Sequence, residues 1–161
     1  MNFSASSIYN QDEECCGPKY AIDRVFSFHP SYGYFVSNYQ LNPWFMITFD
    51  EKILLEKVLI QGSLIAYKVL YEAPFKNISV RAGPSVFKGP TDGRKILDNY
   101  DCKQNEKIGG WGKWYSFECK YTVEAKVITI QRTSDSKVIL VFDEVEIIGK
   151  GKCLCKALFR A

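Results

Sequence analysis

Thiols and carboxylates are the side chains of this sequence most able to do covalent or metal chemistry. The chain has 161 residues and six cysteines, which are Cys15, Cys16, Cys102, Cys119, Cys153 and Cys155. An even number of cysteines in a short chain is typical of disulfides made in an oxidising compartment. Zinc held by the Cys-Cys and Cys-x-Cys pairs is the alternative, but neither spacing matches the common zinc patterns. We therefore expect a secreted protein with disulfides.

Catalytic motifs are absent from the sequence. The only histidine is His29, and there is no Gly-x-Ser-x-Gly, His-Glu-x-x-His or phosphate-binding loop. Three acidic residues, Asp143, Glu144 and Glu146, occur close together. They fall on one expected strand, whose successive side chains face opposite sides, so their spacing does not make a glycosidase pair. The sequence predicts a protein that is not an enzyme.

Tyrosines in two expected loops form the best candidate for a recognition surface. Residues 29–35 and 64–71 are aromatic or apolar where loops are usually polar, and they contain Tyr32, Tyr34, Tyr67, Lys68 and Tyr71. Tyrosine gives a large contact area at a low entropic cost. The alternative is that residues 64–71 form a half-buried extra strand whose side chains belong to the core.

The bulk composition limits both the size and the partners of the protein. Hydrophobic residues make up 47% and aromatic residues 15% of a chain long enough for one core. The net charge is +3 with both signs mixed, and nucleic-acid binding needs clustered cations instead. No apolar stretch reaches the length of about 18 residues that a membrane helix needs.

The elements that position these side chains read as many short strands. Apolar runs rich in Val, Ile, Phe, Tyr and Thr alternate with Gly, Pro, Asn and Asp, the pattern of a β-sandwich. No amphipathic helix appears, and we read residues 50–60 as a turn leading into a strand. The expected strands are Phe45–Phe49, Lys57–Gln61, Asn77–Ala82, Trp114–Cys119, Lys126–Arg132 and Val138–Ile148.

Alternation predicts which face of the last strand is buried. In Val138–Ile148 the mostly apolar parity, which we expect to face the core, holds Ile139, Val141, Asp143, Val145 and Ile147. We expect Lys126–Arg132 and Val138–Ile148 to form a hairpin, whose last strand carries the acidic doublet Asp143-Glu144.

Two stretches carry a family resemblance. One is GPKYAIDRVFSF…NPWFMITFDEKILLEKVLIQG from Gly17, and the other is VITIQRTSDSKVILVFDEVEIIG, closing at Gly149. Their order and residue types resemble the discoidin and coagulation-factor C domains and, within these, the F-type (fucose-binding) lectins. The resemblance implies an all-β jelly-roll sandwich of the galactose-binding-domain-like type. We expect it to span about Ser4 to Cys155, as a single domain over residues 1–161 with a short basic, Cys-containing tail.

The resemblance also implies disulfides. F-type lectins have a bridge at the spacing of Cys102 and Cys119, so we expect that pair. Related domains often tie their termini together, which implies that Cys15 and Cys16 pair with Cys153 and Cys155, in a connectivity that the sequence leaves open.

A structural calcium ion is a further expectation from the resemblance. In F-type lectins a loop beginning Ala-x-Asp-Gly and a Glu in the last strand bind calcium, and the matching residues here are Asp23 and Glu144, with Asp143 beside them. The sequence departs from the family at Arg24 and Val25. The alternative is that Asp23 caps a turn and Glu144 is a solvated or ion-paired strand residue.

The sugar-binding pattern of the family is missing. F-type lectins hold fucose with His…Arg-x-Asp-x4-Arg, but residues 61–75 contain no arginine, and His29 lies too early. We therefore expect no fucose binding of that kind. The predicted function is extracellular recognition of a glycan, with a protein or membrane surface as the alternative partner and intracellular scaffolding as a third.

Overall fold

The computed structural model describes residues 1–23, 34–63, 76–85, 89–90, 92–104, 112–150 and 152–153. In this part of the chain the helices are the four-residue α1 (Glu13–Cys16) and the 3-10 turns η1 (Tyr9–Gln11) and η2 (Pro18–Ile22). None of them is long and apolar enough to cross a membrane. The strands are β1 (Asn2–Ala5), β2 (Phe35–Val36), β3 (Trp44–Gln61), β4 (Ile78–Gly83), β5 (Tyr100–Gln104), β6 (Trp114–Arg132), β7 (Val141–Phe142), β8 (Glu144–Gly149) and β9 (Lys152–Cys153).

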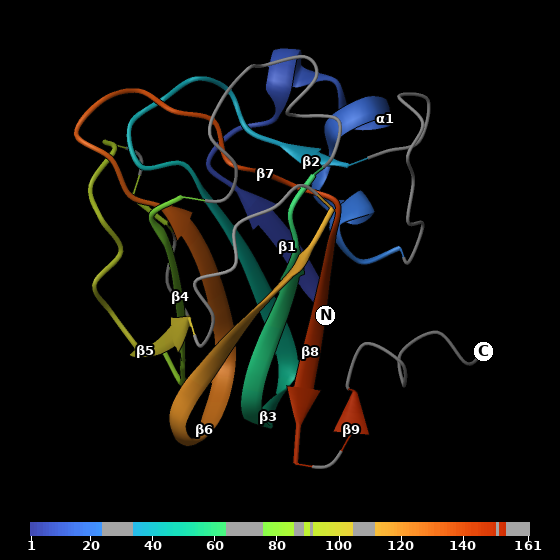
Figure 1. Cartoon of the computed structure of the whole chain (residues 1–161), viewed down its shortest axis with the longest axis vertical. Helices are drawn as coiled ribbons and strands as arrows, with labels where there is room; N and C mark the ends of the chain where they lie inside the picture. Colours follow the sequence, from blue (N-terminus) through green and yellow to red (C-terminus); the bar gives the residue numbers. More distant parts are fainter. Residues whose placement is uncertain are drawn as a thin grey trace.

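Two long strands, β3 and β6, build both layers of the sandwich. They pair antiparallel from Trp44 opposite Gln131 to Gln61 opposite Trp114, with register shifts between Thr48 and Ile53 and between Leu55 and Lys57. Both strands turn over at the lower end of the view in Figure 1, so each contributes one half to each layer. The first half of β3 pairs with the second half of β6 in one layer, and the second half of β3 pairs with the first half of β6 in the other. The core lies between these two layers.

The remaining strands attach to these halves in a fixed order. β1 pairs with the first half of β3, whose other neighbour is the second half of β6, and β4 follows. β5 joins β4 to the first half of β6, and the second half of β3 continues to β8 and β9. The short pair β2–β7 and helix α1 lie at the end opposite the bends (Figure 1). We call this end of the sandwich the loop end.

The bends correct the predicted element boundaries. Residues 45–49 and 57–61 were expected as two strands separated by a turn, but they belong to the single strand β3. Residues 114–119 and 126–132 likewise belong to β6. The turn residues Asp50, Glu51 and Lys52 sit where both strands bend, because a register shift between paired strands lets a sheet turn without breaking.

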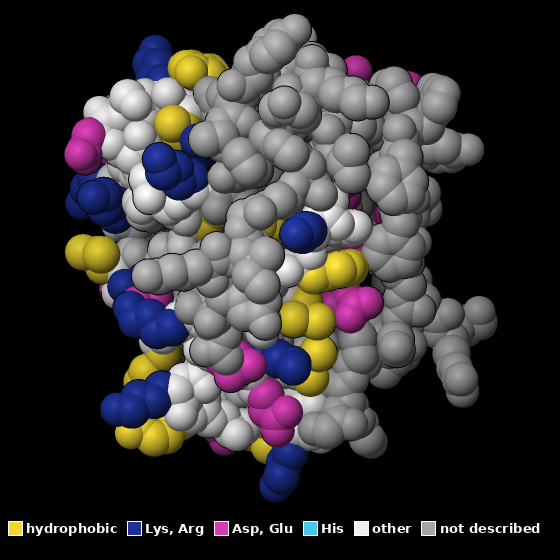
Figure 2. Space-filling view, viewed as in Figure 1, with side chains coloured by type: hydrophobic (Ala, Val, Ile, Leu, Met, Phe, Trp, Pro, Cys, Tyr) yellow, Lys and Arg dark blue, Asp and Glu magenta, His cyan; other side chains and the backbone are white. Residues whose placement is uncertain are grey.

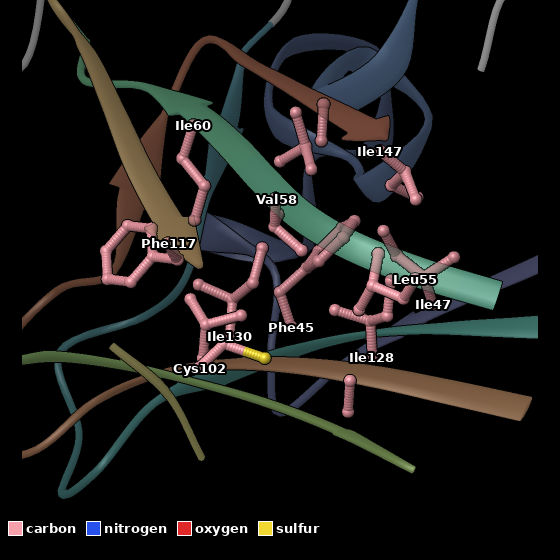
Figure 3. Close-up of a cluster of buried hydrophobic side chains, with 14 of the residues drawn as sticks. Phe45, Ile47, Leu55, Val58, Ile60, Cys102, Phe117, Ile128, Ile130 and Ile147 are labelled. Atoms are coloured by element: carbon pink, nitrogen blue, oxygen red, sulfur yellow. The ribbon is translucent and has the colours of Figure 1, made fainter. Parts of the chain in front are cut away.

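The core lies between the two layers and is apolar throughout (Figure 3). Phe45 and Ile47 point into it from the first half of β3, and Leu55, Val58 and Ile60 from the second half. β6 contributes Phe117, Ile128 and Ile130 in the same way, each at most 1% exposed. Two long alternating strands thus supply most of the material that holds the layers together.

The predicted facing of residues 138–148 is correct in one half only. Val145 and Ile147 are fully buried as expected, but before Asp143 the core residues are Leu140 and Phe142. A bend at Asp143 separates β7 from β8 and exchanges the two parities. The predicted hairpin is wrong for the same reason, because β7 pairs with β2, and β8 pairs with β3 and β9.

One disulfide prediction is confirmed and the other is wrong. Cys102 and Cys119 are bonded and join β5 to β6 where these strands pair. Cys15 and Cys16 are bonded to each other, so neither pairs with Cys153 or Cys155. Cys16 is 1% exposed and packs with Val36 and Ile139, which places α1 against β2. Cys153 lies in β9, and Cys155 lies outside the described residues.

Candidate functional site

Five segments converge at the loop end and set the frame of any site there. The antiparallel pairing brings together the residues before β3, those after β3, those before β6 and those between β6 and β8. Backbone hydrogen bonds fix them: Gly62 N donates to Lys113 O, Asp143 N to Gln61 O, and Val138 N to Gln40 O, at 3.1, 2.9 and 2.9 Å. Residues 34–36 complete the set through the pairing of β2 with β7.

Only Tyr34 of the predicted tyrosine surface falls in the described chain; Tyr32, Tyr67, Lys68 and Tyr71 lie outside it. Tyr34 is half-buried beside the Cys15–Cys16 pair, and its backbone N–H donates to Cys15 O at 3.3 Å. Burial raises the pKa of the Tyr34 phenol, and the negative charge of Asp143 raises it further. Tyr34 therefore marks a place where an aromatic side chain, a carboxylate and the edge of the loop end meet.

The three predicted calcium ligands are only partly gathered. Glu144 is 1% exposed and Asp143 6%, whereas Asp23 is exposed at the end of η2. η2 packs against β8, which begins with Glu144, so Asp23 and Glu144 belong to neighbouring elements. Oε1 of Glu144 accepts a hydrogen bond from Val145 N at 3.2 Å.

These donors fit calcium in kind. Calcium takes carboxylates together with backbone carbonyls. Among the described residues no group of three or more His, Cys, Asp or Glu side chains could hold a metal, so carbonyl oxygens would have to supply most of the ligands. The segment following Asp23, where the resemblance puts those carbonyls, lies outside the described residues.

A cleft of about 520 Å³ opens at the loop end, beside the first half of β3. Four segments form its walls: the end of β1, the residues before β3, the connection between β4 and β5, and the turn before β7. Its lining comprises Ala5, Ser6, Tyr39, Gln40, Leu41, Asn42, Trp44, Pro90, Asp92, Gly93 and Lys137. This volume lies within the range of small-molecule sites, about 300–1,000 Å³.

Buried polar side chains fix two walls of the cleft to each other. Asn42 donates to Gly93 O at 2.5 Å and accepts from Ser134 N at 2.9 Å. Gln131, 2% exposed, donates to Asn42 O and Arg94 O and accepts from Ile96 N, at 2.9, 3.2 and 2.7 Å. These bonds hold the residues before β3 against the β4–β5 connection without any ligand.

Close approach at two glycines completes this wall. A Cβ at Gly89 would lie 2.3 Å from the ring of Trp44, whose Nε1 donates to Pro90 O at 3.1 Å. Gly93 has a φ of +75°, and a Cβ there would lie 2.9 Å from that of Leu41. The connection can therefore lie this close to Trp44 and Leu41 only because both residues lack side chains.

The surface that the cleft offers is mixed in character. Tyr39 and Leu41 are 57% and 41% exposed and give one side an aromatic and aliphatic face. Lys137 is exposed on the segment that pairs with residues 39–41 through the bridge between Gln40 and Val138, and Asp92 is paired with Arg94 at 2.7 Å. Aromatic faces combined with a few polar groups are typical of ligand sites.

Sequence patterns did not predict that these residues form a site. Asp92-Gly93 and Asn42-Pro43 were visible as turns, but the folding of the β4–β5 connection back to the loop end depends on Gln131 in a distant strand. The one local signal of the cleft was the alternation of the apolar residues Tyr39 and Leu41 with the polar Gln40.

Comparisons with known proteins concern the fold. No protein-family model and no curated protein matches the sequence. Among solved structures, an F-lectin from striped bass (Morone saxatilis) serum matches with a TM-score of 0.67 and 18% identity, over 92% of this chain and 46% of that chain.

Two bacterial structures are also similar. An F5/8 type C domain from Bacteroides fragilis gives a TM-score of 0.62 at 13% identity, over 94% of this chain and 92% of that chain. A fucose binding module from Streptococcus pneumoniae gives 0.62 at 17% identity, over 92% and 91%. The chain thus has the jelly-roll sandwich fold of the discoidin and F-type lectin domains, as its sequence predicts.

Proposed function

We propose that this chain is a non-catalytic carbohydrate-recognition module that binds its ligand at the loop end of the sandwich. The observation that carries the proposal is the match of nearly the whole chain to sugar-binding modules. Those proteins include the pneumococcal fucose binding module and a chitosan-binding module from Paenibacillus, which match over 92% of this chain. The cleft beside Tyr39 supports the proposal, because it combines an aromatic face with polar groups.

Fucose held by the His and Arg pattern of F-type lectins is not part of this function. Vicinal hydroxyls need fixed planar donors, and residues 61–75 contain no arginine. The glycan is therefore held in another way. The disulfide between Cys102 and Cys119 supports an extracellular setting for this recognition.

A structural calcium ion remains part of the proposal. Asp23 and Glu144 would hold it together with backbone carbonyls, and the ion would tie the end of η2 to the start of β8. It would stabilise the loop end rather than take part in a reaction. Asp143, buried beside Glu144, adds negative charge near that position.

A glycan array with the oxidised protein tests the function. We expect binding to a limited set of glycans, and we expect mass spectrometry to find those glycans unchanged after long incubation with the protein. Retention of a protein from native fluid in a pull-down, with no glycan bound on the array, would contradict the proposal in favour of a protein-surface partner. Cleavage of a bound glycan would contradict its non-catalytic part.

A further inference from the structure

We infer that the cleft between residues 39–42 and residues 90, 92 and 93 is a subsite for an acidic sugar, stacked on Tyr39 and paired with Lys137. The inference rests on the proposed carbohydrate-binding function and adds to it a place and a ligand class. The cleft is preformed, because Asn42 and Gln131 bond its two walls together. A ligand therefore pays little to order the site.

The aromatic side of the cleft suits a sugar ring. Tyr39 is 57% exposed and Leu41 is 41% exposed on the same short segment. A pyranose has an apolar face of C–H groups that can pack on such a surface, while its hydroxyls stay accessible to polar groups. The volume of about 520 Å³ gives room for a sugar residue with its linkage.

Polar groups for the hydroxyls are present at the same place. Gln40 is partly buried, and its amide oxygen accepts a hydrogen bond from Ser7 Oγ at 2.8 Å. This bond fixes the amide plane and leaves the NH₂ group as a donor. Across the described chain we find no hydrogen bond from that NH₂ group.

The charge balance of the cleft favours an anion. The carboxylate of Asp92 is held by Arg94, which bonds it through both Nε, at 2.7 Å, and the backbone N–H, at 3.2 Å. Lys137 forms no ion pair with any other residue that the structure describes. Asp135 is exposed two residues away but does not line the cleft. The uncompensated charge at the cleft is thus the ammonium of Lys137.

The wider surface points the same way. Figure 2 shows Lys and Arg side chains recurring down the side of the molecule that carries β4 and β5. Lys95 is exposed in the connection that forms one wall of the cleft, where Arg94 is paired with Asp92. Such a field raises the local concentration of an anionic chain before it docks.

Matched glycans test the inference. The probes are immobilised hexoses compared with their uronic acids and their 6-sulfates, and sialylated oligosaccharides compared with their desialylated forms. We expect at least one acidic member to bind about tenfold or more tightly than its neutral partner, because a charged hydrogen bond is added. The carboxylated and sulfated arms distinguish the two sources of the anion.

Four variants locate the effect. Lys137→Gln should abolish the preference for the acidic member, Lys137→Arg should keep it, and Tyr39→Ala should weaken both members. Lys150→Gln removes the same charge from an exposed lysine just after β8, at the bend end, and should change nothing. All three positions are exposed, and equal melting temperatures would show that the variants fold.

The outcomes separate this inference from the proposed function. Binding of glycans that Lys137→Gln and Tyr39→Ala leave unaltered would overturn the subsite while keeping the function. Binding of no glycan at all would overturn both. Lys137-dependent binding of poly-glutamate that exceeds every acidic glycan would assign the cleft to acidic peptides instead.

Discussion

At the scale of single residues, the loop end is defined by buried polar groups. Asp143 and Glu144 are 6% and 1% exposed, and Tyr34 lies near enough to Asp143 for its titration to be affected. Buried carboxylates are costly unless hydrogen bonds or cations compensate them. Such groups are therefore good reporters of what occupies the loop end.

The phenol of Tyr34 should lose its proton at a higher pH than an ordinary tyrosine. Its neutral form is favoured in the folded state, so its contribution to stability is complete below the ordinary tyrosine pKa of about 10 and is lost as the pH rises through its raised pKa. A pH titration followed by absorbance at 295 nm should contain a late step, above the ordinary tyrosine pKa, and Tyr34→Phe should remove this step. Asp143→Asn should move it only part of the way back, because burial is the larger cause.

The control for this titration is Tyr121→Phe, which changes a tyrosine that is 69% exposed at the bend of β6 and should leave the late step in place. A late step that survives Tyr34→Phe would contradict the assignment.

Calcium should stabilise the fold through Asp23 and Glu144. Calcium at about 100 times its dissociation constant would add about 2.7 kcal/mol to the free energy of unfolding by mass action. Thermal unfolding of demetallated and calcium-loaded protein measures the effect, and Glu144→Gln should remove it. Glu146→Gln, two residues along β8, should preserve it, and melting curves that coincide with and without calcium would refute the site.

At the scale of elements, local sequence patterns predicted the strands better than their ends. Apolar patterning correctly predicted that residues 45–49 and 57–61 form strands, and both lie in β3. It could not show that the polar residues Asp50–Lys52 bend a continuous strand, because that depends on the partner β6. The same holds at Asp143, where a bend exchanges the buried parity between β7 and β8.

The disulfides and the cleft show the same contrast between what the sequence reveals locally and what depends on contacts between distant segments. Cys102 and Cys119 could be paired by family spacing because both lie on paired strands. The Cys15–Cys16 bond was missed because the tie between termini was assumed. The cleft was missed because Gln131 in β6 connects segments far apart in the sequence, and no periodicity records such a contact.

The two disulfides should contribute unequally to stability. Cys102 and Cys119 are 17 residues apart, and closing a loop of this size typically stabilises by about 2–4 kcal/mol. Cys15 and Cys16 are adjacent, so their bond constrains the unfolded chain little. The double variant Cys102→Ala, Cys119→Ala should therefore lose more unfolding free energy in urea than the variant Cys15→Ala, Cys16→Ala.

The two variants are matched, because each removes one buried cysteine. This is Cys102, which is 2% exposed, in the first variant and Cys16, which is 1% exposed, in the second. An equal or larger loss for the adjacent pair would mean that packing of α1, and not loop closure, dominates.

At the scale of the whole molecule, the two ends of the sandwich differ in structure. At one end β3 and β6 bend without breaking, so each strand runs from one layer into the other. The other end carries the pair β2–β7, the buried carboxylates Asp143 and Glu144, and the cleft. A rigid sandwich that presents variable loops at one end is a common arrangement for recognition. Our proposal is that glycans bind at the loop end.

Amide chemical shifts during titration with a glycan selected on the array test this claim most directly. We expect shifts in residues 37–44, 61–63 and 133–143 at the loop end, and none in residues 50–53 or 120–124 at the bends. We also expect the glycan to be recovered intact. Shifts confined to the bends, or saturation of the protein with no shifts at the loop end, would contradict the proposal.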